Sequence, residues 1–446
     1  MKEYFFVLLL LLSATVGCRW PQRPITEQEV AGAWADLTLR ITRYTPSNSP
    51  TFASRAFGYV GLTMYESIVP AYPTYQSMVT HLNGLDSLPL PQRDVPYDWV
   101  LALNAGQAYI LQNIYQQTSE ANKRSIDSLE NVFYDYFSRK QSQKEVADRS
   151  VAYGRAVAAA IFEWSKTDGG HRGYLKNFDK SYAHPKHPGG WRPPMYAQSF
   201  SHHPLHPHWG QNRTFLRQDA LLPAPATIPY DTATGSPYYQ QFALVYAKKL
   251  TQEEKEIALW WADDPGETFT PPGHSYYLAT IALRKTSPPL ILWAQTYART
   301  GMAVADAFIN CWKWKYHYFS ERPNTFIPRF MDQEWESFWP DPPFPAFPSG
   351  HAIQSAAAAT VLTDLFGEPF SITDSAHVGR PPDELREVEF KARSYRSFWE
   401  VAVESADSRF YGGIHTRQDN QAGQDAGVLI GKNVNALPWR RKVGNE

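Results

Sequence analysis

The sequence contains little cysteine and almost no net charge. Only Cys18 and Cys311 occur among 446 residues, and 43 basic residues nearly balance 44 acidic ones, which leaves a formal net charge of −1. This balance does not indicate a polybasic surface for nucleic acid or for an anionic membrane. Cys311 lies in an apolar stretch with helical periodicity, and we expect it to be a buried free thiol.

Long apolar runs are also scarce, and the one at the N-terminus is too short to span a bilayer comfortably. It follows Lys2 and ends in small residues before Cys18, which is the pattern of a secretory signal over residues 1–18. Gly17-Cys18 resembles a bacterial lipobox, although Thr15 stands where Leu is commoner. We expect a lipid on Cys18 and a periplasm-facing anchor in the bacterial cell envelope. An ordinary signal peptide and an uncleaved anchor are the alternatives.

Strand-like alternation is rare, whereas amphipathic helical periodicity dominates and predicts an all-α protein. The predicted helices cover residues 26–45, 53–69, 97–116, 119–139, 143–166, 238–249, 252–261, 276–284, 289–318 and 352–365. Aromatic residues make up 15% of the chain and prolines number 35, so we expect a packed body with ordered Pro-rich loops. We expect an N-terminal helical region over 19–236 and a C-terminal one over 237–446, forming one compact unit, with a homo-oligomer possible.

A long irregular segment over residues 168–229 interrupts the helices and is rich in Gly, Pro, His and Trp. Long loops inside a compact protein usually have a function. Its histidines suggest zinc, but no Cys or acidic partner lies near the densest group, and Pro204 and Pro207 would break a helix that aligned them. We therefore expect a loop that wraps the mouth of an active site. Likewise, residues 263–267 could bind a cation, but their pattern favours a helix end and turn.

The sequence around Ser349, Gly350 and His351 places a hydroxyl, a flexible amide and an imidazole at the start of the predicted helix over 352–365. Unpaired N–H groups and the positive end of the dipole favour an anion at such a helix start. On its own, Ser-Gly before a helix is more often just a helix cap.

Two further stretches carry side chains of matching chemistry. Lys315 lies near the end of one predicted helix and Arg322 follows seven residues later, on the same face if the helix persists. The third stretch contains Arg409, then a bend at Gly412-Gly413, then His415 and Asp419. Because these last two are four apart, we expect them to share a helix face. An Asp that accepts from one ring nitrogen fixes the tautomer of a His and leaves the other nitrogen free to attack or to ligate.

Together the three stretches supply three fixed cations and two histidines, which suits a tetrahedral oxyanion such as phosphate or its structural mimic vanadate. The order Lys-x6-Arg-Pro, Pro-Ser-Gly-His and Ser-Arg-x5-His-x3-Asp resembles the tripartite signature of the type 2 phosphatidic acid phosphatases and vanadium-dependent haloperoxidases. Every signature residue is present. The resemblance covers roughly the last third of the chain, and it implies helical bundles of the haloperoxidase and acid phosphatase type.

The resemblance implies two chemistries at one site. In a haloperoxidase, vanadate would be bound through His415, and His351 would assist protonation of peroxide, which then oxidises a halide. In a phosphomonoesterase, His415 would attack phosphorus and His351 would protonate the leaving group. Asp419 would orient His415 in both. The residues that would hold the oxyanion are Lys315, Arg322, Ser349, Gly350, Arg409 and His415.

Three aromatic side chains, Trp312, Phe344 and Phe347, could line a dry rim beside this site or belong to the core. About 300 residues precede the signature, more than small soluble acid phosphatases of the superfamily need, and this favours a haloperoxidase that uses hydrogen peroxide. An acid phosphatase acting on a phosphomonoester is the alternative, and a non-catalytic anion-binding lipoprotein is a third.

Overall fold

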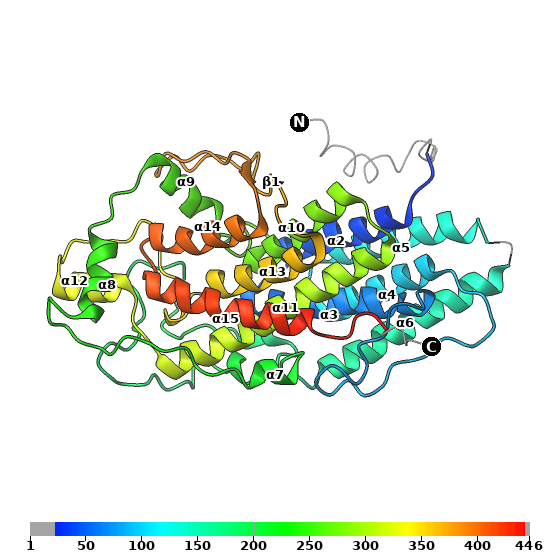
Figure 1. Ribbon diagram of the computed structural model, residues 1–446, viewed down its shortest axis with the longest axis horizontal. Helices are drawn as coiled ribbons and strands as arrows, with labels where there is room; N and C mark the ends of the chain where they lie inside the picture. Colours follow the sequence, from blue (N-terminus) through cyan, green and yellow to red (C-terminus); the bar gives the residue numbers. More distant parts are fainter. Residues whose placement is uncertain (1–22, 142, 200, 442–446) are drawn as a thin grey trace.

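The computed structural model describes residues 23–141, 143–199 and 201–441, and most of these lie in α-helices (Figure 1). The described helices are α2 (Glu27–Tyr44), α3 (Pro50–Glu66), α4 (Trp99–Ile114), α5 (Glu120–Ser138), α6 (Lys144–Ser165), α7 (Arg217–Ala220), α8 (Pro237–Tyr246), α9 (Gln252–Trp260), α10 (Thr270–Thr286), α11 (Leu290–Tyr318), α12 (Pro323–Phe330), α13 (Gly350–Phe366), α14 (Phe398–Tyr411) and α15 (Arg417–Asn435). Two short antiparallel strands, β1 (Ile372–Asp374) and β2 (Arg393–Tyr395), pair Ile372 with Tyr395. The all-α class is therefore confirmed.

Most predicted helices begin within a few residues of the expected position because polar caps mark their starts. Thr26 and Thr251 each form a capping box with a Glu three residues later. The start of α10 was predicted six residues too late. Its first turn holds Pro271 and Pro272, which lack the N–H that a first helical turn leaves unpaired.

Helix α11 runs through the centre of the molecule, where it packs against α3 and α13 (Figure 1). The main apolar core is continuous and draws buried side chains from Val30 in α2 to Trp439 near the C-terminus. Both predicted halves thus contribute to one core, while their division into two regions stays a prediction. Cys311 in α11 is a buried free thiol, as expected.

Small residues bring α13 and α15 close together, which matters because both helices carry signature residues. Gly423, Gly427 and Gly431 lie four residues apart along α15 and face α13. A Cβ atom on Gly427 would lie 2.2 Å from the carbonyl oxygen of Ile353, far inside any real contact distance. The glycine face therefore sets how close the N-terminal ends of the two helices lie.

Lys315 and Arg322 do not share a helix face, because the helix that carries Lys315 does not persist beyond Tyr318. Phe319 adopts a left-handed conformation with φ of 47° and ends α11 after Tyr318. Arg322 is instead the residue before the first turn of α12. The turn between the two helices brings both cations to the same region by a different route.

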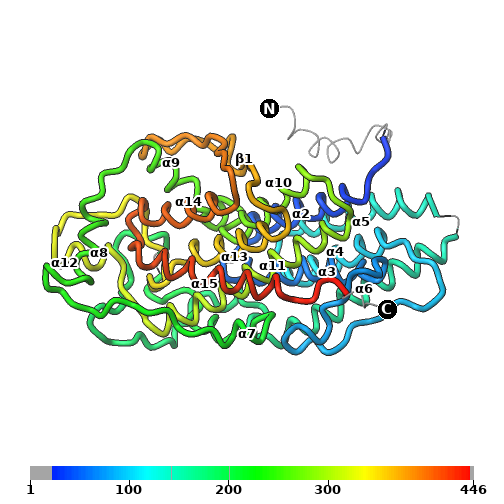
Figure 2. Tube along the Cα trace, in the orientation of Figure 1, coloured from blue at the N-terminus to red at the C-terminus, as the bar shows by residue number. Residues whose placement is uncertain are grey.

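The described residues of the segment over 168–229 form only short helical turns: α7 and two 3-10 turns at Gly173–Leu175 and Trp209–Gln211. Figure 2 shows such long irregular stretches running around the outside of the helices. Within the described part of the chain, no helix is long and apolar enough to cross a membrane. The predicted signal segment and Cys18 lie outside the described residues.

Two buried carboxyl groups, Asp219 in α7 and Asp306 in α11, tie the end of this segment to the central helix. Asp306 accepts the backbone N–H groups of Phe215 and Leu216 at 2.7 and 3.0 Å, and Asp219 accepts the Asn433 amide at 2.6 Å. Burial raises the pKa of both groups, and the proximity of Asp219 raises that of Asp306 further. The folded state therefore retains protons that an unfolded carboxyl releases near its usual pKa of about 4.

We predict that Asp219→Asn stabilises the protein at pH 8 more than at pH 5. A raised carboxyl pKa contributes stability that is lost as pH rises through the folded value, and the neutral amide removes that loss. Melting temperatures of both proteins across pH 5–8 measure this effect. Asp425→Asn, an exposed change on α15, is the control, and a pH-independent difference between Asp219→Asn and the parent would contradict the interpretation.

Candidate oxyanion site

The starts of α12, α13 and α15 meet at one place. Ser349 caps α13 by accepting the Ala352 N–H at 3.4 Å, and its own N–H donates to the Asp419 carbonyl oxygen at 2.9 Å. Thr416 caps α15 through a capping box with Asp419. These bonds join the second and third signature stretches directly and place their helix N-termini side by side.

A pocket of about 540 Å³ opens above these helix starts and has Gly350, His351, Arg409 and His415 on its lining. Trp312 and Phe344 also line it, with ring centroids 4.9 Å apart. The other predicted aromatic does not reach this lining, because Phe347 is buried and packs edge-on against Tyr318. Ser349, Lys315 and Arg322 lie deeper, each with 0% of its surface exposed.

His415 has one ring nitrogen occupied and the other directed towards a cation. Its Nδ1 lies 2.9 Å from Asp419 Oδ2, and its Nε2 lies 3.4 Å from Arg322 Nη1. Since the guanidinium can only donate, Nε2 carries a lone pair and Nδ1 carries the proton. Burial, followed by the charges of Arg322 and Lys315, lowers the pKa of His415 well below its usual value. The imidazole is therefore neutral at neutral pH.

The contact between His415 and Asp419 arises differently from the shared helix face that their spacing suggested. His415 precedes Thr416, the capping residue, and so lies outside α15. Asp419 occupies the third position of the helix, from which its Oδ2 accepts both the Thr416 N–H at 3.0 Å and the His415 ring. The capping turn thus makes the contact.

Three buried cations surround this histidine without a carboxylate partner. Lys315 donates to the Pro345 and Ala346 carbonyl groups, Arg322 to those of Phe344 and Ile414, and Arg409 to that of Trp261. Among the described residues, none of the three cations lies within 4.0 Å of a carboxylate oxygen. Uncompensated buried charges are strongly unfavourable, so this arrangement favours the binding of an anion.

The cations perturb one another as well. Burial lowers the pKa of Lys315 to about 7, with a further decrease from Arg322, and burial lowers that of Arg409 to about 10. A bound oxyanion would restore the usual pKa values by pairing with these groups.

Among the signature residues, His351 is the one with a buried polar side-chain atom that lacks a hydrogen-bond partner. Its Nε2 is buried and has no hydrogen-bond partner, although the ring borders the pocket. Burial, with the nearby charge of Arg409, lowers the pKa of His351 well below its usual value. A ligand in the pocket can supply the missing partner of Nε2.

These residues fit a tetrahedral oxyanion such as vanadate or phosphate. The unpaired cations and the orphaned Nε2 call for a ligand that carries negative charge and accepts hydrogen bonds, and His415 Nε2 offers a lone pair for a covalent or coordinate bond. The residues that could hold the group are Lys315, Arg322, Ser349, Gly350, Arg409 and His415. Their assignment as ligands stays a prediction.

One part of the wall was not assigned to the site from the sequence. Residues 262–266 line the pocket directly after α9, so the expected helix end and turn is present. Trp261 holds Arg409 through its carbonyl oxygen at 3.0 Å. Burial raises the pKa of Asp264 to about 7, and the charge of Arg409 opposes this rise. A backbone carbonyl has no sequence signal, so this contact was not predictable.

The long segment lies at the mouth of the pocket, as expected, but its histidines do not line the pocket. The lining residues from this segment are Asn177, Phe178, Gln198, Ser199 and Leu205. His206 is buried and bonded to the Thr51 hydroxyl and to the Gly173 carbonyl group. His208 lies 3.2 Å from Asp179. The segment thus forms part of the wall at the pocket mouth, and hydrogen bonds of its histidines hold its backbone in place.

We predict that Asp419→Ala lowers catalytic activity about 10- to 100-fold, as for other carboxylates that orient a ligating histidine. The change removes the acceptor for His415 Nδ1–H and for the Thr416 N–H, so the ring loses its fixed tautomer. Steady-state kinetics of this variant and of Asp425→Ala, an exposed aspartate on the same helix, provide the comparison. Unchanged kinetics in Asp419→Ala would show that the capping turn alone orients His415.

Comparison with known proteins places this geometry in context. The family model of the VCPO second helical-bundle domain matches residues 295–438, which span α11 to α15. No curated protein sequence matches the chain. The chain is similar to the crystal structure of the first bacterial vanadium-dependent iodoperoxidase, with 29% identity, a TM-score of 0.82, and coverage of 95% of this chain and 100% of that one.

Two further solved structures share the fold at lower identity. The holo-type bacterial vanadium-dependent chloroperoxidase has 15% identity and a TM-score of 0.63, with coverage of 88% of this chain and 92% of that one. The apo-type bacterial chloroperoxidase has 15% identity and a TM-score of 0.66, with coverage of 87% and 93%. At this identity the likeness establishes the fold alone.

Proposed function

Because the chain belongs to the superfamily of vanadium-dependent haloperoxidases and type 2 phosphatidic acid phosphatases, we propose that it is a vanadium-dependent haloperoxidase, an oxidoreductase that uses hydrogen peroxide to oxidise a halide. The observation that supports this most is the set of three buried, unpaired cations around a neutral His415. We propose iodide as the halide, since the iodoperoxidase covers nearly the whole chain at 29% identity.

In this proposal the chain's own residues prepare the site before any substrate arrives. His415 Nε2 would supply a lone pair to vanadium, while Asp419 keeps the ring proton on Nδ1. Lys315, Arg322 and Arg409 would neutralise the charge of the bound oxyanion from fixed positions that need no reorganisation. Vanadate, when bound, would activate hydrogen peroxide as a Lewis acid.

His351 is the residue best placed to hold or move a proton. His351 borders the pocket, its Nε2 has no hydrogen-bond partner, and its lowered pKa keeps the ring neutral at neutral pH. Trp312 and Phe344 exclude water from the adjacent wall, which strengthens the charge interactions around the oxyanion. A partly desolvated halide can approach over this apolar surface.

The test uses the purified chain without residues 1–18. One half is loaded with orthovanadate, freed of excess, and assayed for peroxide-dependent oxidation of iodide and bromide. The untreated half is assayed on p-nitrophenyl phosphate with and without added vanadate. We expect vanadate-dependent halide oxidation, faster with iodide, and negligible phosphate release. Rapid phosphate release that vanadate inhibits would replace the haloperoxidase proposal with the phosphatase alternative at the same residues.

We also propose that Cys18 anchors the protein in the bacterial cell envelope, facing the periplasm. The pattern of residues 1–18 supports this proposal. Metabolic labelling with a radioactive fatty acid should label the parent and not Cys18→Ala, and a labelled variant would contradict lipidation at this position.

A further inference from the structure

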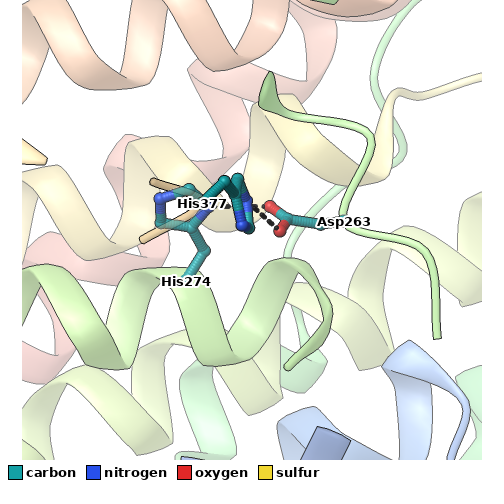
Figure 3. A group of neighbouring side chains, drawn as sticks. All are labelled: Asp263, His274 and His377. Carbon is teal, nitrogen blue, oxygen red and sulfur yellow. Dashed lines mark hydrogen bonds and ion pairs between the residues drawn. The ribbon is translucent and has the colours of Figure 1, made fainter. Parts of the chain in front are cut away.

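A second buried group of titratable side chains adjoins the pocket, whose lining includes one member of the group, Asp263. His274 in α10 has Nδ1 2.8 Å from Asp263 Oδ2 and Nε2 2.8 Å from Asp374 Oδ2. The other Asp263 oxygen lies 3.0 Å from His377 Nε2 (Figure 3). All four side chains are buried, and Asp374 also accepts the Trp260 indole N–H at 2.8 Å. Neither the proposed chemistry nor the signature uses this array.

The spacing of Asp263, His274 and His377 resembles a metal site, because one ligand atom from each lies within 4.8 Å of the others. The hydrogen bonds favour a proton instead. Both His274 nitrogens face carboxylate oxygens, and the two carboxylates raise the pKa of His274 to about 10 despite the opposing effect of burial. An imidazolium that donates from both nitrogens has no lone pair left for a metal.

The array is connected to the pocket through Trp261. The indole ring of Trp261 stacks on the His274 ring, with centroids 4.4 Å apart and planes 24° from parallel. A cation against an indole face is attracted by the ring quadrupole. The Trp261 carbonyl oxygen accepts Arg409 Nη1 at 3.0 Å. One stacked ring therefore connects the buried imidazolium with Arg409 of the oxyanion site.

The same array holds the backbone that follows Trp261. Asp263 has a φ of 49°, a left-handed conformation that few residues other than Gly, Asn and Asp adopt. Both of its carboxylate oxygens are bonded to histidines, one on α10 and one after β1. These bonds fix the turn over residues 262–266 that forms one wall of the pocket.

We propose that His274 is a positioning residue for the oxyanion site: held between Asp263 and Asp374, it fixes Trp261, whose carbonyl oxygen holds Arg409 in place. This inference rests on the proposed function only in that the pocket binds an oxyanion. It assigns a role to residues outside the signature and requires no metal.

The test compares His274→Phe, which keeps an aromatic ring against Trp261 but loses both hydrogen bonds, with the milder Asp374→Asn. The control is His317→Gln, an exposed change on α11. Binding of inorganic phosphate and of orthovanadate to each purified protein is measured by calorimetry, well below the melting temperature. We expect at least a tenfold loss of affinity in both array variants and no change in the control.

If His274 has a purely structural role, its replacement will lower the melting temperature but leave the oxyanion affinity of the folded variant unchanged. That result would overturn the proposal. If His274→Phe does not fold, Asp374→Asn decides by the same criterion. One divalent metal ion per chain in the parent, lost in Asp374→Asn or His274→Phe, would also overturn it in favour of a metal site. If the parent binds neither oxyanion, the assignment of the oxyanion site is wrong. That outcome differs from the one that overturns the role of His274, in which the variants bind the oxyanions as tightly as the parent does.

Discussion

Replacing His415 with Ala is expected to abolish halide oxidation, leaving below about one-thousandth of the parent rate, as with other groups that bond directly to the reacting centre. The imidazole is neutral, its tautomer is fixed by Asp419, and its Nε2 is directed at the cationic cluster. The Ala side chain offers no lone pair, so the site would lose its only covalent attachment for the oxyanion.

The His415→Ala variant is also expected to fold. His415 lies outside α15, and the Thr416 N–H keeps its bond to Asp419. Activity with saturating vanadate, together with the melting temperature, separates loss of chemistry from loss of structure. His317→Ala serves as the matched change at an exposed position. Appreciable turnover by a folded His415→Ala protein would show that His415 is not the attachment point.

The second large effect is expected for Lys315→Met, which should weaken orthovanadate binding about 100- to 1000-fold, by analogy with the rate loss found when one fixed donor to an oxyanion is removed. Lys315 is buried among carbonyl groups and has no carboxylate partner within the described residues. Methionine fills a similar volume without the charge. Lys313→Met, an exposed change two residues away, should leave affinity unchanged.

The same variant has a pH signature. Burial lowers the pKa of Lys315 to about 7 in the folded state, so the unfolded chain binds more protons than the folded one between about pH 7 and 10. Stability contributed by Lys315 therefore rises with pH across this window. We expect the melting temperature of the parent, relative to that of Lys315→Met, to rise from pH 7 to 9.5. A constant difference would show that Lys315 is not strongly perturbed.

Much of the fold could be predicted because capping side chains mark the starts of many helices. Thr26, Ser119 and Thr251 cap helices with side chains that any sequence reading can recognise. The helix α14 was missed, although Ser397 caps it, because the preceding strand and turn carry no apolar periodicity. The end of α11 at Tyr318 was predicted, but the conformation of Phe319 that ends it was not, since a left-handed aromatic residue has no reliable sequence signal.

The residues of the candidate site could be predicted from the sequence, but the hydrogen bonds that hold them in place could not. The signature spacing identified His351, Arg409 and His415, which all line one pocket. The way these residues are held depends on backbone carbonyls, such as that of Trp261, which every residue possesses. The roles of His274 and Asp374 likewise depend on contacts 100 residues apart, which no local pattern encodes.

The central claim is that His415 and the three buried cations form one vanadate site, and a crystal structure grown with orthovanadate tests it most directly. The account predicts one vanadium atom per chain, bonded to His415 Nε2, with its oxygens hydrogen-bonded to Lys315, Arg322 and Arg409. Vanadium bound elsewhere, or no vanadium in the pocket at saturating orthovanadate, would contradict it.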